Sequence, residues 1–326
     1  MTRVRAVALS TAVLFLAGCS VPLPTPQPDA LPAAMPPALS VEQAEDIVAE
    51  VSASLADADA ALSVDVPGPR VTGPAATIRS FQYLLVTAGL ADALTVIPSG
   101  AQTLVLPTTD EWPRTVMVVT EPPEDLQAPL LLTLVQTEPR APYQLWSWVR
   151  LFPGVQTPAL AQPELGSAPV EPDAPELAVS PTEVLAQYVD VLTNRDASPY
   201  AAAFTADPLR QGIAQTKDAF VAVVGANGTL TETYQPDEAG TYSMATADGG
   251  GAIVVGTVRT VTTITLVDST LKIGDQTAAI LGTDTVKSSL AITWLSVVAF
   301  AVPPAGSDAP IQVLGAEHSR IQVTGG

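Results

Sequence analysis

The sequence predicts an α+β protein of two similar domains, each with one or more N-terminal helices packed on a curved antiparallel sheet. Three observations lead to this fold class. The 326 residues exceed what a single hydrophobic core usually serves. A helical pattern followed by strand-like runs occurs twice, and a Pro-rich stretch separates the two occurrences. We therefore expect a first domain at residues 40–153, a linker at 154–179 and a second domain at 180–326.

The N-terminus has the pattern of a bacterial lipoprotein signal. Arg3 and Arg5 precede a short apolar run, and Leu-Ala-Gly stands directly before Cys19, the one cysteine of the chain. We expect residues 1–18 to be a signal peptide and Cys19 to carry diacylglycerol, which anchors the protein on the extracytoplasmic face of the cell membrane. The remainder of residues 19–39 is dense in proline and is expected to act as an extended tether.

The first packed element is predicted to be a long helix that begins after Ser40. The Ser40 hydroxyl can accept from the backbone of Gln43 while the Gln43 side chain reaches back, as in a capping box. Apolar residues then recur at helical spacing as far as Leu62. Six strand-like runs, bounded by Gly, Pro or Asp, follow at Thr77–Thr87, Leu94–Ile97, Thr103–Leu106, Thr115–Glu121, Pro129–Thr137 and Tyr143–Phe152.

The second domain is predicted to open with two helices. Ser180 and Pro181 begin the first, and Asp207 and Pro208 begin the second, which ends where Gly225 can adopt a left-handed cap. Strands then dominate the remainder of the chain. They are expected at Thr229–Tyr234, Thr241–Thr246, Ala252–Val267, Leu271–Ile273, Leu290–Val302 and Ile311–Val323.

The charge balance argues against nucleic acid as a partner. The chain has 14 Lys and Arg residues against 33 Asp and Glu residues, which gives a net charge of -19. Phosphate backbones are bound by clustered cations, whereas the three lysines, Lys217, Lys272 and Lys287, lie far apart in the sequence. An anionic lipid surface is disfavoured for the same reason, so the lipid on Cys19 has to supply the membrane contact.

One short motif resembles that of a known family. Arg70 to Ala75 read Arg-Val-Thr-Gly-Pro-Ala, and Arg79 and Tyr83 follow. This segment, with the order of helices and strands, resembles uncharacterised actinobacterial lipoproteins with tandem nuclear-transport-factor-2-like domains, which are cone-shaped α+β units. The resemblance implies a conical sheet whose cavity holds ligand or side chains, and it implies no reaction.

Two tryptophans are the most distinctive candidates for ligand binding. In a strand, Trp146 and Trp148 share a face with Gln144 and Arg150 and could line a pocket, or they could cover a helix or a domain interface. Arg70 and Arg79 are scarce cations in an acidic chain, so we expect them to meet carboxylates of the protein or of a ligand. The candidate ligand-binding residues are Trp146, Trp148, Arg150, Arg70, Arg79 and Tyr83.

No catalytic residue, metal site or cofactor is predicted. The mature chain offers only His318 and a lipidated Cys19 as soft metal ligands, and no Gly-x-Ser-x-Gly elbow occurs. His318 could serve as a general base, but we expect a histidine on an edge strand or the surface. An enzyme would require a carboxylate of raised pKa inside a cone, such as Asp268 or Glu232.

These observations favour a non-catalytic, membrane-anchored lipoprotein that binds a protein or a component of the cell envelope. The alternative is a lipoprotein that binds a small ligand or lipid in one cone cavity, and an enzyme ranks third. The partner and the oligomeric state are not specified by any motif in the chain.

Cys19→Ala is expected to release the protein from the membrane, because it removes the thiol that carries the lipid. Fractionation of cells that express either form measures this. A Cys19→Ala chain that stays in the membrane fraction would contradict the anchoring prediction.

Overall fold

A computed structural model describes residues 35–63, 68–122, 127–247 and 250–326, and residues 35–326 form one compact unit. The predicted signal peptide, Cys19 and most of the tether lie outside the described residues. Within the described ranges, no helix combines the length and the apolar character that a membrane crossing requires.

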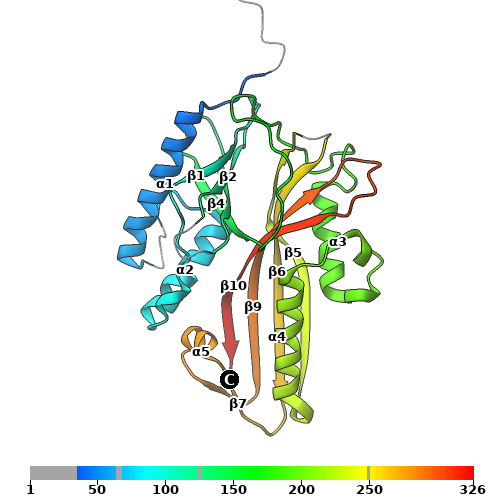
Figure 1. Cartoon of the computed structure of the whole chain (residues 1–326). Coiled ribbons are helices and arrows are strands. Elements are labelled where there is room, and N and C mark those ends of the chain that lie inside the picture. The colour runs from blue at the N-terminus through cyan, green and yellow to red at the C-terminus, as the bar shows by residue number, and fades with distance from the viewer. Residues whose placement is uncertain (1–34, 64–67, 123–126, 248–249) are drawn as a thin grey trace, which may run out of the picture. The chain divides into compact units, whose positions relative to one another are not determined.

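The fold is a mixed α+β arrangement around one curled, antiparallel sheet of eight strands (Figure 1). The strand order is β1-β2-β3-β4-β10-β9-β6-β5, and each strand runs antiparallel to its neighbours. The strands span Ala101–Val105 (β1), Arg114–Thr120 (β2), Leu130–Gln136 (β3), Gln144–Leu151 (β4), Gly228–Ala245 (β5), Ala252–Leu266 (β6), Ser289–Val302 (β9) and Gln312–Gly325 (β10). A small second sheet pairs β7 (Leu271–Lys272) with β8 (Thr285–Val286).

The two halves of the large sheet meet at a short junction between β4 and β10. Only Gly315 and Ala316 of β10 pair with β4, opposite Leu151 and Arg150. Beyond Ala316 the other side of β10 continues along β9 to the C-terminus. The predicted antiparallel α+β architecture is thus confirmed, whereas the division into two similar domains stays a prediction.

The helix predicted after Ser40 is confirmed as α1, Val41–Ala61. The backbone N–H of Gln43 donates to the Ser40 hydroxyl (3.2 Å), and the Ser40 N–H donates to the Gln43 side chain (2.9 Å). This capping box satisfies two backbone donors that the first turn would otherwise leave unpaired. The face turned to the sheet is apolar and buried: Ala44, Val48, Val51, Leu55 and Ala58.

The strand predicted at Thr77–Thr87 is wrong, because this segment belongs to the helix α2, Gly73–Thr87. Its β-branched and aromatic residues are typical of strands, but Pro74 in the first turn and the buried faces of Ile78, Gln82 and Leu85 follow helical spacing. Gly73 has φ +55°, and a Cβ there would lie 2.7 Å from Trp146 Cδ1. No strand forms at Leu94–Ile97, which follows the short 3₁₀ turn η1, Ala91–Ala93.

In the second half, the predicted helices are confirmed as α3 (Pro181–Asn194) and α4 (Pro208–Val224). The two strands expected between residues 229 and 246 are one strand, β5, whose register shifts between Pro236 and Thr241. A further short helix, α5 (Asp275–Leu281), was not predicted. Short 3₁₀ turns complete the connections at η2 (Arg195–Ala197), η3 (Ala201–Ala203) and η4 (Gly225–Asn227).

The long strands serve hydrophobic cores on both of their faces. On β9, Leu295 and Val297 join the large core that α1, α2 and β1–β4 enclose. Alternate residues such as Phe300 point to the opposite face, into the core beneath α3. Towards the start of β9, on the same face as Phe300, Ile292 and Trp294 belong to a third core with residues of α4 and α5. One strand therefore holds three cores together.

His318 packs on Trp294 of the third core and forms no catalytic arrangement with its sequence neighbours. Its ring stacks on Trp294, with centroids 4.6 Å apart and planes 6° apart, and its Nδ1 lies 2.8 Å from the Ser296 hydroxyl oxygen. Glu317 and Ser319 instead contact each other, since the Ser319 hydroxyl donates to the Glu317 carboxylate (2.6 Å). Burial lowers the pKa of His318 to about 4, so the ring is neutral at neutral pH.

Gly315→Ala is expected to destabilise the protein by roughly 3 kcal/mol, because the added methyl group overlaps the carbonyl oxygen of Arg150 at the β4–β10 junction. Gly212→Ala is the matched control. Gly212 lies within α4 with no neighbour within 4 Å of an added Cβ, so alanine there is expected to stabilise by about 0.5–1 kcal/mol. Urea unfolding of the three proteins measures both changes; equal stabilities would contradict the role of the junction.

His318 is expected to make the protein less stable as the pH falls from 6.5 towards 4. In that range the unfolded chain binds a proton that the folded state excludes, because the folded pKa is about 4 and the ordinary value is 6.5. The loss amounts to about 3 kcal/mol and is absent above pH 6.5. Unfolding free energies of the wild type and His318→Gln across this range isolate the contribution. Parallel curves would show that His318 does not cause the pH dependence.

Candidate functional site

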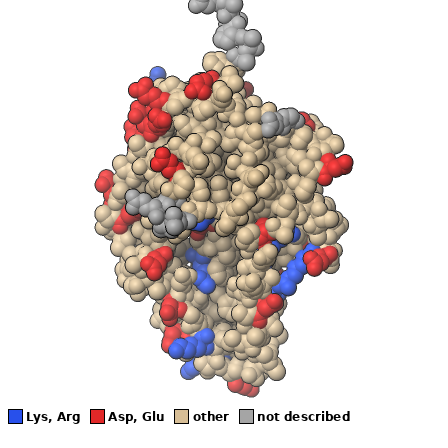
Figure 2. All heavy atoms as spheres, viewed as in Figure 1, with Lys and Arg blue, Asp and Glu red and all other residues tan. Residues whose placement is uncertain are grey.

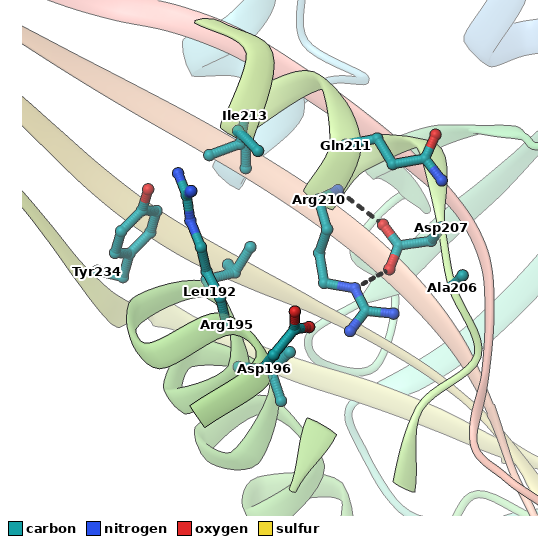
Figure 3. Close-up of a pocket in the computed structure, with 11 residues that line it drawn as sticks. Leu192, Arg195, Asp196, Ala206, Asp207, Arg210, Gln211, Ile213 and Tyr234 are labelled. Atoms are coloured by element: carbon teal, nitrogen blue, oxygen red, sulfur yellow. Dashed lines mark hydrogen bonds and ion pairs between the residues drawn. The ribbon is translucent and has the colours of Figure 1, made fainter. Parts of the chain in front are cut away.

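A cavity of about 300 Å³ lies between the C-terminal end of α3, the N-terminal end of α4 and the strand β5 (Figure 3). The two helix ends that form it are defined locally. Helix α3 stops at Arg195, which has φ +54°, and α4 starts at Asp207, whose side chain accepts from the backbone N–H of Arg210 (2.8 Å). The lining residues are Val191, Leu192, Arg195, Asp196, Ala206, Asp207, Arg210, Gln211, Ile213, Ala214 and Tyr234.

Asp207 ties one wall of this cavity together. Its side chain is fully buried, and besides capping α4 it forms an ion pair with Arg210 Nε (2.6 Å) and accepts from the Tyr188 hydroxyl (3.1 Å). Arg210 also donates to the carbonyl oxygen of Thr205. Burial and the adjacent Asp207 raise the pKa of Tyr188. The positive charge of Arg210 is therefore compensated by Asp207, and its guanidinium is held in place by Asp207 and the carbonyl oxygen of Thr205.

Arg195 is in a different situation, because its side chain has no hydrogen bond or ion pair with any described residue. It is exposed, and Figure 3 shows it reaching across the cavity towards Tyr234. The Tyr234 hydroxyl donates to Glu232 (2.7 Å), which also pairs with Lys217 (3.2 Å). Burial and the bond to Glu232 raise the pKa of Tyr234.

This arrangement can bind an anionic group and cover an apolar body. Arg195 offers free guanidinium donors, while Val191, Leu192 and Ile213 supply an apolar floor. Two carboxylates line the cavity: Asp207 is engaged in the ion pair with Arg210, whereas Asp196 is exposed beside Arg195. Glu232, behind Tyr234, pairs with Lys217.

Three of the sequence-predicted ligand-binding residues meet in a second place, between α1, α2 and the sheet. Tyr83 donates its hydroxyl hydrogen bond to Asp59 (2.7 Å), and the same carboxylate lies 3.3 Å from Arg79 Nε. The Arg79 guanidinium lies over the Trp148 ring, 5.3 Å from its centroid. Trp148 in turn donates to Glu317 (3.2 Å). This Arg79 network joins both halves of the chain.

The centre of the network is the fully buried Arg79. Its Nη1 donates to the Gln82 side chain and to the carbonyl oxygen of Thr95, both at 2.8 Å. Burial lowers the pKa of Arg79, and the negative charges of Asp59 and Glu317 act against this shift. Burial also raises the pKa of Glu317, although bonds from Ser319 and Trp148 oppose the effect. Both charges persist in the interior because they face opposite charges and hydrogen-bond partners.

The remaining predicted residues lie apart from this network. Trp146 is buried against Gly73 and meets Tyr242 edge-on, with ring centroids 4.8 Å apart. Arg70 forms an ion pair with Glu50 and donates to the carbonyl oxygen of Tyr143 (3.2 Å). Arg150 donates to the carbonyl oxygen of Ala128 (2.8 Å). Trp146 and Trp148 both face α2, which covers them.

Sequence reasoning missed Asp59, Glu317 and the α3–α4 cavity. The scarcity of cations did indicate that Arg79 needs a carboxylate, but its Asp59 partner comes from another helix and Glu317 comes from a distant strand. Of the two carboxylates considered for an enzyme, Glu232 is held by Lys217 and Tyr234, and Asp268 lies in a turn with φ +47°. Among the described residues, no cluster of three or more His, Cys, Asp or Glu side chains is placed to hold a metal ion.

Comparison with curated proteins and with solved structures gave no match. Comparison with protein families gave one match, which spans residues 36–325 and therefore nearly the whole described chain. Both the Arg79 network and the α3–α4 cavity lie within the matched residues. The chain belongs to the family described as a domain of unknown function (DUF8094).

Proposed function

We propose that this protein is a lipid-anchored, extracytoplasmic lipoprotein that binds a small anionic amphiphile in the α3–α4 cavity and catalyses no reaction. The observation that carries the proposal is Arg195, a guanidinium without a partner among the described residues at the edge of a cavity with an apolar floor. The lipid anchor on Cys19 and the place at the cell membrane rest on the N-terminal pattern of the sequence.

The electrostatic surroundings support an anionic ligand at this point. The chain has a net charge of -19, and Figure 2 shows Asp and Glu side chains spread over the visible face, with Lys and Arg mainly in its lower half. In such a protein, an anion is repelled from most of the surface and is attracted where a cation is left uncompensated. Asp207 compensates the charge of Arg210. Arg195, which forms no ion pair with a described residue, supplies that attraction, next to the exposed carboxylate of Asp196.

The apolar floor of the cavity favours a ligand that has an apolar part in addition to its anionic group. Leu192 is buried, and Ile213 is partly buried beneath the cavity. A ligand that covers these side chains gains roughly 25 cal/mol for each Å² of apolar surface removed from water. A plain inorganic anion would not gain this contribution. An amphiphile with one acidic group uses both features of the cavity.

A protein or envelope partner is the second candidate, and one observation favours it. Three large apolar side chains near the end of α4 are exposed: Val221 (51%), Val223 (66%) and Val267 (63%). Large apolar side chains left exposed at one end of the fold are typical of surfaces that meet another macromolecule, although Val221 and Val223, two positions apart on α4, point to different sides of the helix. We further propose that the two halves are related α+β units, because each opens with two helices and continues into antiparallel strands.

Arg195→Gln is expected to weaken binding of 1-anilinonaphthalene-8-sulfonate, an anionic amphiphile, by about tenfold. One charge-assisted hydrogen bond of about 1.4 kcal/mol accounts for this factor. Fluorescence titration of soluble residues 20–326 measures the dissociation constant, and native mass spectrometry of the same chain from its secretory host shows whether a natural ligand co-purifies.

Arg140→Gln is the matched control. Arg140 is also exposed and also has positive φ (+68°), but it lies in the turn between β3 and β4. Its substitution removes the same charge and is expected to leave the dissociation constant within about twofold of the wild type. If both variants bind the probe equally well, the cavity is not the site and the protein-partner candidate takes precedence.

A further inference from the structure

A second cavity, of about 470 Å³, lies on the side of the sheet that carries the third core, where α5 begins. Helices α4 and α5 lie at the same end of the large sheet (Figure 1), and both contribute to its walls. The other walls come from β9, β10 and the segment between α2 and η1. This cavity has no lining residue in common with the α3–α4 cavity, so it is a separate place on the fold.

Arg320 on β10 is the one basic residue among the described residues that line this cavity. It stands directly opposite Trp294 of β9 in the strand pairing, and its guanidinium lies over the Trp294 ring, 4.3 Å from the centroid. Leu290, four residues before Trp294 on the same strand, also belongs to the third core and lines the cavity. Because alternate residues of a strand share a face, Arg320 and Leu290 meet the cavity from the same side of the sheet.

The charge of Arg320 is not compensated by a carboxylate of the described chain, since its guanidinium forms no ion pair there. Its Nη1 donates to the Gln276 side chain, while Nη2 has no hydrogen-bond partner among the described residues. Nε is buried and likewise unpartnered. A partly buried guanidinium without a counter-charge is costly, and a bound anion would reduce that cost.

Two neighbouring side chains of α5 add hydrogen-bond donors. Gln276 accepts from Arg320 through Oε1, so its amide nitrogen stays available to donate. The Thr277 hydroxyl also belongs to the lining and has no hydrogen-bond partner in the described part of the chain. Stacking on Trp294 and the bond to Gln276 hold the guanidinium in one orientation, so an incoming anion orders little that is not already ordered.

The carboxylates of the neighbourhood favour this cavity over the adjacent one as a place for an anion. A smaller cavity of about 220 Å³ shares Arg320 and Gln276 with it, but is also lined by Glu317 and Asp92. In the larger cavity, Asp275 is the one carboxylate among the described lining residues, and it is exposed. Water and salt screen an exposed charge, so Asp275 repels an anion only weakly.

Apolar side chains supply the remaining part of the wall: Leu90, Phe220, Ile273 and Leu290. A ligand that covers them gains roughly 25 cal/mol for each Å² of apolar surface removed from water. The volume of 470 Å³ corresponds to roughly fifteen water molecules at about 30 Å³ each. The cavity therefore has room for a hydrocarbon chain or ring beside an anionic group.

From this arrangement we propose that the cavity between α4 and α5 binds a carboxylic acid with an apolar body, with its carboxylate on Arg320 and its apolar body against Phe220 and Leu290. A carboxylate matches the planar guanidinium and can accept from Nη1 and Nη2 together. An inorganic anion would make the charge contact but would leave the apolar wall in water. The site goes beyond the proposed function, since it involves neither Arg195 nor the α3–α4 cavity.

The test compares 4-phenylbutanoate with its neutral amide, 4-phenylbutanamide, which keeps the apolar body and removes the charge. Isothermal titration calorimetry uses residues 20–326, which contain the whole compact unit, with Arg195→Gln to weaken binding in the α3–α4 cavity. The acid is expected to bind at one site per chain, and the amide at least tenfold more weakly, because it lacks the charge-assisted hydrogen bonds to the guanidinium.

A further substitution assigns this difference to Arg320. In the same background, Arg320→Gln is expected to weaken binding of the acid at least tenfold and to leave the affinity for the amide within about twofold. Arg259→Gln is the matched control. Arg259 also stands on the large sheet but pairs with Asp237 (2.7 Å) and does not line the cavity, so its loss should leave the affinity for the acid within about twofold.

Three results would each overturn the proposal: equal affinity for acid and amide, no binding heat with millimolar acid, or unchanged affinity for the acid in a folded Arg320→Gln chain. The comparison of acid with amide requires no substitution in β10, so it decides the question even if Arg320→Gln prevents folding. The two sites also fail separately, because the fluorescent probe and Arg195→Gln test the α3–α4 cavity, whereas the acid and Arg320→Gln test this one.

Discussion

The pairing of β10 with β4 is the constraint on which the remainder of the structure depends. It consists of two residue pairs, and at one of them a side chain is impossible, because a Cβ on Gly315 would overlap the backbone of Arg150. This contact turns two sets of antiparallel strands into one sheet. It also ends abruptly, and from Glu317 onward β10 presents its free edge to α2. The cavity lined by Glu317 to Arg320 and by residues of α2 lies along this free edge.

The same junction explains why so much charge is buried next to it. Arg79 on α2 lies over Trp148 on β4, and Trp148 donates to Glu317 on β10. Asp59 from α1 and Tyr83 from α2 complete the network. An isolated buried guanidinium would be costly, whereas one that meets carboxylates, carbonyl oxygens and a ring face is tolerated and fixes the arrangement of the elements around it. The network thereby ties α1 and α2 to strands from both halves.

Much of the local structure could be predicted from the chain, and the failures have physical causes. The starts of three helices were predicted correctly from their N-cap residues, Ser40, Ser180 and Asp207, because capping depends on residues only three positions apart. Helix α2 was taken for a strand because its residues favour extended structure, and its burial against β4 overrode that preference. Of the candidate ligand-binding residues, Arg79, Tyr83 and Trp148 meet in one network and Trp146 packs against α2, and their part in ligand binding stays a prediction.

By itself, the sequence determined the antiparallel α+β class, the capped helices, the strong negative charge and the need of Arg79 for carboxylate partners, since these follow from composition and from short-range spacing. Only the tertiary structure decided which carboxylates those are, that the halves share one sheet, and that Arg195 and Arg320 keep free donors beside cavities. These properties arise from contacts between residues far apart in the chain, such as Trp148 and Glu317. Periodicity carries no information about which distant elements meet, so these contacts follow only from the packing of the folded chain.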